Sequence, residues 1–220
     1  MKTKITAFVL LLFISPMFLT AEEEGESLTL EKQLYTDFSG SVINSAVVNL
    51  REKPDTDSKV IARLNKGDKI TVIEQTGAAL FVDKYLGVWL KVKSPKGKDG
   101  YVLSSFVNAP ANKVEHFHLF FDRFKKAWIK KNIKEVSKHT DFPLQYLEAF
   151  EGSVESLEIP ETDFFKKAVI KEPYMYKMTY EIESGNTILV HYGYEAQQYT
   201  LFFMIADGKW RLFKIKISSC

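Results

Sequence analysis

Histidine and cysteine are the side chains of this 220-residue chain best suited to metal binding and nucleophilic catalysis. His116 and His118 lie two residues apart in a stretch with helical periodicity, and on a helix this spacing separates two rings by about 200°. We therefore predict that they share no metal ion. Cys220 is the last residue, and no chain follows it to hold the thiol at a helix start, where its pKa would fall. We predict no cysteine nucleophile.

A second set of side chains could transfer protons. Six of the ten tyrosines lie between residues 174 and 199, and a buried tyrosine needs a partner for its hydroxyl group. We nominate Asp141, Tyr176, His191 and Tyr192 as pocket residues, for a bound small molecule or for acid–base catalysis. The alternative, which we prefer, packs these tyrosines under helices with their hydroxyl groups in solvent. It predicts that the protein is not an enzyme and uses no cofactor.

The first 21 residues have the pattern of a secretory signal peptide. Two lysines precede an almost wholly apolar run from residue 5 to residue 19, and Ala21 offers a small residue for cleavage. Residues 22–40 carry six acids and one lysine, a charge of −5, and their polarity predicts a solvated acidic leader. We therefore expect an exported protein, periplasmic or extracellular. No later stretch is apolar enough to span a bilayer.

The charge balance argues against one class of partner. Residues 41–109 carry eleven bases and seven acids, a charge of +4, and residues 110–220 carry sixteen bases and fifteen acids, a charge of +1. Generic nucleic-acid binding needs a larger basic excess, so we expect no nucleic-acid partner. Residues 108–113 contain a proline and two asparagines between a strand-rich and a helix-rich region. We place a domain boundary there.

Residues 41–109 have the pattern of an all-β domain. Five short runs, apolar or alternating, are punctuated by Pro54, Gly67, Gly87 and Gly100. Proline fixes φ and cannot donate to a strand ladder, so the chain leaves the sheet at Pro54 as a polar loop. Five strands in so short a segment predict a small closed barrel, because an open sheet would leave unpaired edges.

This domain resembles the bacterial Src-homology-3-like (SH3) family. The family typically shows Val-Asn-Val-Arg, a proline-containing polar loop, a Val-Ile strand, a Lys-Gly pair, a tryptophan strand and a closing Gly-Trp-Val. The matching positions are Val48, Asn49, Leu50, Arg51, Pro54, Ser58, Val60, Ile61, Leu64, Lys66, Gly67, Trp89, Val92, Gly100, Tyr101 and Val102. Tyr101 replaces the usual tryptophan, and an insertion over residues 76–87 lengthens the connection before Trp89.

The resemblance implies a ligand groove lined by Tyr85, Trp89 and Tyr101. Aromatic faces stack on sugars and on extended peptides, and nearby lysines at positions 91, 93, 96 and 98 would meet the carboxylates of cell-wall stem peptides. The implied partner is peptidoglycan or an envelope protein. The alternative is that Trp89 fills the barrel and that the lysines only solvate a hairpin.

Residues 113–220 predict an α+β domain. An apolar stripe from Val114 to Val136 indicates an amphipathic helix, broken near Asn132, and a weaker helix covers residues 162–169. Four alternating runs follow, and Asp207-Gly208 between the last two is a strong hairpin signal. We expect helices packed on a four-stranded antiparallel sheet. The Phe-Pro-Leu at 142–144 and the final Asp-Gly-Lys-Trp strand resemble the nuclear-transport-factor-two-like cone.

Together these patterns predict two domains, an all-β SH3-like barrel over residues 41–109 followed by a cone-like α+β domain over residues 113–220. The leading interpretation is an exported, non-catalytic binding protein of the bacterial cell envelope. The alternative places a small-molecule pocket or an acid–base enzyme in the second domain. A deep cavity lined by Tyr176, Tyr192 or His191, with Asp141 at its mouth, would favour that alternative. A cone filled by Phe121, Phe124 and Trp128 would disfavour it.

Overall fold

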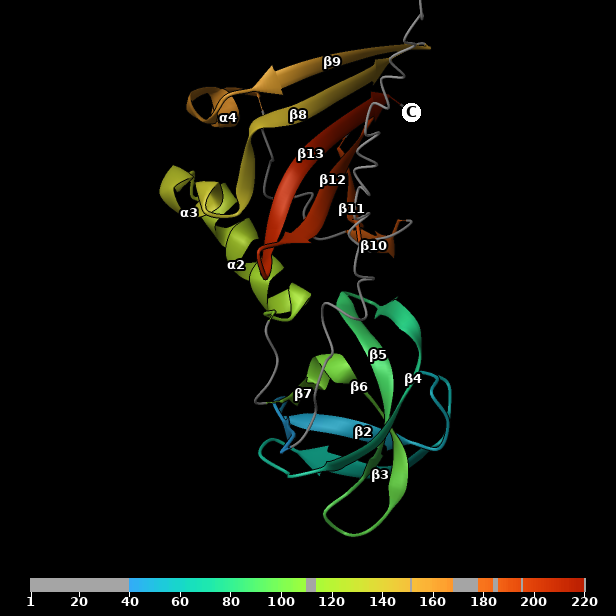
Figure 1. Cartoon of the computed structure of the whole chain (residues 1–220). Helices are drawn as coiled ribbons and strands as arrows, with labels where there is room; N and C mark the ends of the chain where they lie inside the picture. Colours follow the sequence, from blue (N-terminus) through green and yellow to red (C-terminus); the bar gives the residue numbers. More distant parts are fainter. Residues whose placement is uncertain are drawn as a thin grey trace, which may run out of the picture.

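The computed structural model describes residues 40–109, 114–150, 152–167, 178–183, 186–194 and 196–219. The predicted signal peptide, the acidic leader up to residue 39, Tyr176 and Cys220 lie outside the described residues. The chain forms two β-rich units, one built from residues before 109 and the other from residues after 114 (Figure 1). The predicted order, an all-β unit followed by an α+β unit, is confirmed.

The first unit contains a five-stranded antiparallel sheet. Its strands are short apolar or alternating segments separated by proline, glycine and polar turns, as the sequence indicates. The sheet order is β3-β2-β6-β5-β4, and β1 pairs separately with β7. The elements are β1 (Val42–Ile43), β2 (Val47–Arg51), β3 (Val60–Asn65), β4 (Thr71–Val82), β5 (Tyr85–Lys93), β6 (Asp99–Leu103), a 3-10 helix (Ser104–Phe106) and β7 (Val107–Asn108).

The prediction of a closed barrel is wrong, because β3 and β4 are the two edges of an open sheet. The turn between them pairs with the segment before β2 instead. Gly67 N donates to Ile43 O and Ile70 N donates to Ser41 O, at 2.8 and 3.1 Å. The segment before β2 therefore supplies hydrogen-bond acceptors for backbone groups of the turn between β3 and β4.

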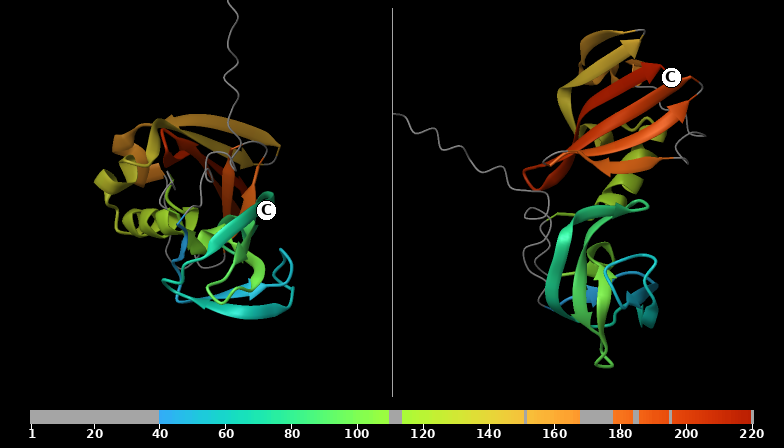
Figure 2. Two further views of the ribbon diagram at one scale, coloured as in Figure 1. Left: turned by 60° about the horizontal axis from the view of Figure 1, so that its bottom comes forward. Right: turned by 90° about the vertical axis from the view of Figure 1, so that its right-hand side faces the viewer.

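The insertion before Trp89 is the tip of a long β-hairpin. Strand β4 ends at Val82 and strand β5 begins at Tyr85, so only Asp83 and Lys84 connect them. Asp83 has a φ of 52°, as a tight hairpin turn requires. A bulge interrupts the pairing between Thr76 and Leu80. The hairpin therefore extends well beyond the rest of the first sheet (Figure 2).

The second unit contains a six-stranded sheet of order β10-β11-β12-β13-β8-β9. All neighbours are antiparallel except β13 and β8, which are parallel. The elements are α2 (Phe117–Ile129), α3 (Ile133–Ser137), β8 (Thr140–Phe150), β9 (Ser153–Ile159), a 3-10 helix (Glu161–Asp163), α4 (Phe164–Lys167), β10 (Thr179–Ile182), β11 (Ile188–Tyr194), β12 (Gln197–Ala206) and β13 (Lys209–Ser219).

The sheet has six strands where the sequence analysis predicts four. Residues from Thr140 to Tyr146 show an alternation that the analysis missed, since Thr140, Leu144 and Tyr146 are buried while the residues between are more exposed. Helix α3 ends at Ser137, well before Pro143, which lies within a new strand. The parallel pairing of β8 with β13 joins Thr140 to Leu212, a separation that no local pattern encodes.

Helix α2 packs its phenylalanines against one face of this sheet. Phe117, Phe120, Phe121 and Phe124 all lie within 5.5 to 5.7 Å of the Phe203 ring, centroid to centroid. Asn132 begins α3 by accepting a hydrogen bond from Glu135 N at 3.2 Å, which confirms the predicted break. The Asp207-Gly208 turn between β12 and β13 is also confirmed.

The two units share one hydrophobic cluster, which runs from Ile43 in the first to Ile217 in the second. Phe81 from the β4–β5 hairpin packs between them, and Figures 1 and 2 show the hairpin reaching toward β10. Buried His116 also joins the units, since its Nε2 lies 3.1 Å from Val107 O. Within the described ranges, no helix has the length and apolar character that crossing a membrane requires.

Candidate binding groove

The outer face of the first sheet carries a groove whose floor comes from three adjacent strands. Val48 and Leu50 of β2 point into the core, so Val47, Asn49 and Arg51 point outward. Trp89 of β5 lies opposite Leu103 of β6 on this same outer face. We define the groove by the residues lining its two adjoining cavities, namely Val47, Val48, Asn49, Arg51, Pro54, Asp55, Thr56, Leu80, Phe81, Val82, Asp83, Trp89, Leu103 and Phe106.

Two walls rise above this floor. One is the loop between β2 and β3, with Pro54, Asp55 and Thr56, and the other is the tip of the β4–β5 hairpin. The cavities have volumes of about 200 and 400 Å³ and share Thr56, Val82 and Trp89. They therefore form a continuous trough of mixed apolar and polar lining, a shape that suits an extended chain better than a compact ligand.

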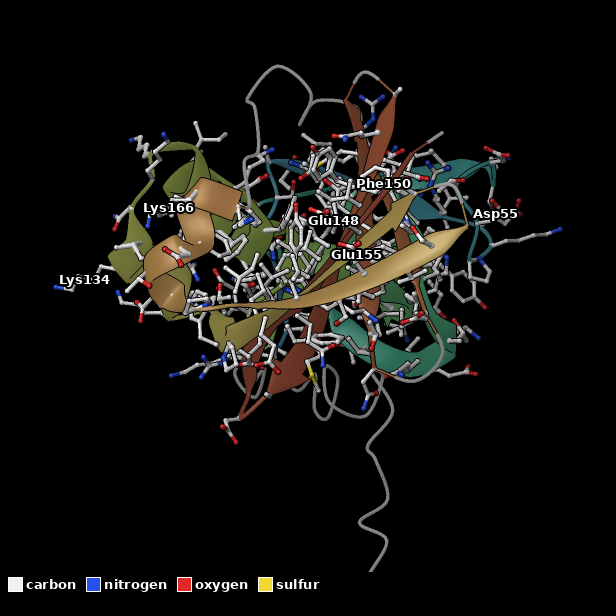
Figure 3. The ribbon with its side chains drawn as sticks, turned by 90° about the horizontal axis from the view of Figure 1, so that it is seen from above. Asp55, Lys134, Glu148, Phe150, Glu155 and Lys166 are labelled. Carbon is white, nitrogen blue, oxygen red and sulfur yellow. The ribbon has the colours of Figure 1, made fainter. Side chains whose placement is uncertain are left out.

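The loop wall is held in place by side-chain hydrogen bonds. Arg51 Nη1 donates to Ser58 O at 2.7 Å, and Ser58 Oγ accepts from Lys53 N at 2.8 Å. Asp55 Oδ1 accepts from Asp57 N at 3.0 Å, which forms a local turn. The loop projects on the opposite side of the molecule from Lys134 of α3 and Lys166 of α4, where Asp55 is labelled (Figure 3).

One end of the groove carries two cationic side chains, Arg51 and Lys91, and Glu74 of β4 lies opposite Lys91. Tyr101 of β6 lies opposite Arg51 on one neighbouring strand and Lys91 on the other. The three side chains therefore form a row across the sheet, next to the row that holds Trp89 and Leu103. Such a row can receive a carboxylate, because arginine and lysine both donate charge-assisted hydrogen bonds. A tyrosine ring between them offers an apolar face.

The predicted strip of Tyr85, Trp89 and Tyr101 is only partly contiguous. All three lie on the outer face, and Trp89 and Tyr101 occupy neighbouring rows. Trp89 is only 7% exposed, lies outside the central hydrophobic cluster and lines both groove cavities. Tyr85 is displaced toward the second unit, where its ring contacts Phe106 and His118 at 4.8 and 4.9 Å.

Of the four predicted lysines, Lys91 is the one that adjoins the groove. Lys93, Lys96 and Lys98 are exposed near the β5–β6 turn, and Lys98 Nζ donates to Ile61 O at 3.3 Å. The sequence analysis missed Val47, Thr56 and Val82. The alternation in β2 could have indicated Val47, since Val48 and Leu50 must share the buried face. No local sequence pattern indicated that Val82 lines the same cavities as Trp89.

The pocket candidates of the second unit are scattered over its sheet. Asp141 lies at the exposed start of β8, 3.8 Å from Arg211 Nη1. His191 bonds Thr200 Oγ1 at 3.0 Å and lies 3.3 Å from Glu181. Tyr192 is buried, its ring stacks on Tyr199 at 4.9 Å, and burial raises its pKa well above the ordinary value. None of the three lines the two groove cavities or the two cavities beside Lys84 and Asp122.

The rings of His116 and His118 are closer than the sequence analysis expected. Their centroids are 5.9 Å apart, because His116 is the N-cap of α2 with an extended backbone and the helical angle does not apply. Burial lowers the pKa of both rings, and that of His118 to about 4. Within the described ranges, no group of three or more potential ligands surrounds a metal position.

The comparison with protein families decides the identity of the first unit. Residues 46–108 match the family model described as a bacterial SH3 domain. Residues 46–108 are a bacterial SH3 domain. The groove therefore belongs to this SH3 domain, with its second wall completed by the extended hairpin. The chain matches no curated protein.

Solved structures with a likeness to the chain include two NTF2-like proteins. One, from Bacteroides fragilis, is 14% identical with a TM-score of 0.38, and the match covers 64% of this chain and 64% of that one. The other, of unknown function and from Pseudomonas putida, is 13% identical with a TM-score of 0.28, covering 46% of this chain and 82% of that one. The chain thus spans under two thirds of the first structure's length, and scores this low carry no functional argument.

Proposed function

We propose that the protein is an exported, non-catalytic binding protein of the bacterial cell envelope, and that the SH3 domain binds peptidoglycan through the groove. The observation that supports this proposal is the trough between the β2–β3 loop and the hairpin tip, with Trp89 in its floor and Arg51 and Lys91 at one end. An envelope protein that presents an extended segment is the alternative partner.

The chemistry of the groove fits a stem peptide of the cell wall. Such a peptide is extended, carries small apolar side chains and presents carboxylates. Val47, Leu103 and Trp89 would contact the apolar part, while Arg51 and Lys91 would receive a carboxylate. The predicted signal peptide and acidic leader support export to the compartment where peptidoglycan lies.

Binding to purified cell-wall sacculi tests this function, with Val47→Glu as the decisive variant. Val47 lines the groove and is 56% exposed, so a glutamate there can stay solvated in the free protein and change stability by no more than about 0.5 kcal/mol. A bound peptide would desolvate the carboxylate, so we expect sacculus affinity to fall at least about tenfold.

Val154→Glu is the matched control. Val154 is a strand valine in β9 of the second unit and is 67% exposed. We expect this variant to bind sacculi like the unsubstituted protein. If neither the unsubstituted protein nor the control binds sacculi, the proposed function is refuted. Equal binding by the Val47→Glu variant would place any sacculus site outside the groove.

A further inference from the structure

The tip of the β4–β5 hairpin has contacts on both of its sides. On one side, Leu80, Phe81, Val82 and Asp83 line the larger groove cavity, next to Trp89. On the other side, the Phe81 ring stacks on Tyr180 of β10, with centroids 5.5 Å apart and planes at 28°. Phe117 of α2 meets the same ring edge-on at 5.9 Å. One segment is thus both a wall of the groove and the contact with the second unit.

The aromatic contacts outweigh the ion pair that accompanies them. Lys84 Nζ lies 3.2 Å from Asp122, but the two side chains are 42% and 39% exposed. Exposed pairs of this kind contribute little because solvent screens them. Phe81 and Tyr180 are instead partly buried and packed against the shared hydrophobic cluster. Their stacking therefore holds the β4 side of the tip, while Tyr85 on the β5 side contacts His118 of α2.

Pairing within the hairpin does not by itself fix the β4 side of its tip. Strand β4 is an edge of the sheet, and its pairing with β5 shifts register at a bulge between Thr76 and Leu80. Gly77 in this bulge has a φ of 74°. Beyond it, the pairs from Leu80–Gly87 to Val82–Tyr85 form a two-stranded ribbon. The first unit holds the β5 side of this ribbon, where Ser105 Oγ donates to Leu86 O at 2.6 Å. On the β4 side, the ring contacts of Phe81 are with the second unit.

We propose that Tyr180 and Phe117 of the second unit are positioning residues for the SH3 groove, so the second unit sets the affinity of the SH3 domain. This inference rests on the proposed function. A wall held in the binding position lowers the ordering cost of association. By linkage, a ligand in the groove strengthens the contact between Phe81 and Tyr180 by the same factor. The second unit acts through the tip and touches no ligand.

Two measurements on the full chain test this positioning role. The first is the affinity for purified sacculi, and the second is amide hydrogen exchange at residues 80–84 without ligand. In the Tyr180→Ala variant we expect roughly three- to tenfold weaker binding and faster exchange at the tip, because the stacked pair is lost. Tyr180→Phe keeps the ring and should retain both properties. Tyr180→Leu serves if the alanine variant folds poorly, with the same expected losses.

Phe150→Ala is the matched control for loss of a partly buried ring. Phe150 lies on β8, which three strands separate from β10, and it packs against the same hydrophobic cluster. Its position on the β8–β9 hairpin is labelled in Figure 3. We expect this variant to keep both sacculus affinity and tip exchange. Similar losses in Phe150→Ala and Tyr180→Ala would overturn the positioning role.

The exchange measurement separates this inference from the proposed function. If the unsubstituted protein fails to bind sacculi, the proposed function is wrong. Faster exchange at residues 80–84 in Tyr180→Ala would still support the inference that Tyr180 holds the hairpin tip in position. If sacculi bind but the Tyr180→Ala variant shows unchanged exchange and affinity, the groove binds without help from the second unit and the inference is refuted.

Discussion

Gly100 lies where β6 passes closest to β2, beneath the cationic end of the groove. A Cβ atom built there would lie 2.7 Å from Leu50 Cγ, 2.8 Å from Arg51 O and 2.9 Å from Ile61 Cδ1. Carbon atoms in good contact are about 3.5 to 4.0 Å apart. The Gly100→Ala variant must therefore separate the two strands or displace fully buried Leu50. This close approach is also what places Tyr101 beside Arg51.

The size of the effect follows from which neighbours can yield. Ile61 Cδ1 is the end of a flexible side chain, but Arg51 O is backbone and Leu50 is enclosed by the core. Overpacking of this kind costs about 1–3 kcal/mol, and reduced freedom of the unfolded chain returns about 0.4–1 kcal/mol. We expect Gly100→Ala to lower the free energy of unfolding by about 1–2 kcal/mol.

Equilibrium urea unfolding measures this change, and Gly193→Ala provides the control. Gly193 lies in β11, and a Cβ there would meet only Gln197 O, at 3.9 Å. We expect this control to be as stable as the unsubstituted protein or up to about 0.5 kcal/mol more stable. A Gly100→Ala variant as stable as the control would show that β6 does not approach β2 this closely.

Two further predictions concern histidine titration and the phenylalanine core. Burial, followed by the charges of His116 and Lys84, lowers the pKa of His118 to about 4. As the pH falls from 6.5 to about 4, His118 is therefore protonated in the unfolded chain but stays neutral in the folded protein. The free energy of unfolding should fall by about 1 kcal/mol over this range, after allowance for partial exposure. Urea midpoints from pH 7 to pH 4 should fall less in His118→Asn, and an unchanged slope would contradict this assignment. Phe203→Ala removes a fully buried ring that four phenylalanines of α2 contact. We expect it to lower the free energy of unfolding by about 3–5 kcal/mol. An equal loss in the half-buried control Phe213→Ala would disprove that packing.

Local patterns in the sequence predicted the elements that depend on near neighbours. The stripe that includes Phe117, Phe121 and Phe124 predicted α2, since helical periodicity is set within a few turns. Asn132 marked the break before α3, and Asp207-Gly208 marked the last hairpin. In each case the decisive residues lie within one turn or one hairpin of each other.

The missed features depend on contacts between distant residues. The alternation in β8 was weak, and its parallel pairing with β13 joins segments about 70 residues apart. The open edges of the first sheet follow from the pairing of Ser41 and Ile43 with the turn near Gly67. The angle between His116 and His118 was misjudged because a cap residue does not follow helical geometry.

By itself, the sequence determined the SH3 domain, its proline-broken loop and the strand that carries Trp89, because turn residues and alternation act locally. Only the tertiary structure decided that the inserted residues form a hairpin that reaches β10. Phe81, Phe117 and Tyr180 meet across about 100 residues of chain, and such a contact arises from the packing of two units rather than from any periodicity. The second wall of the groove is therefore a tertiary property.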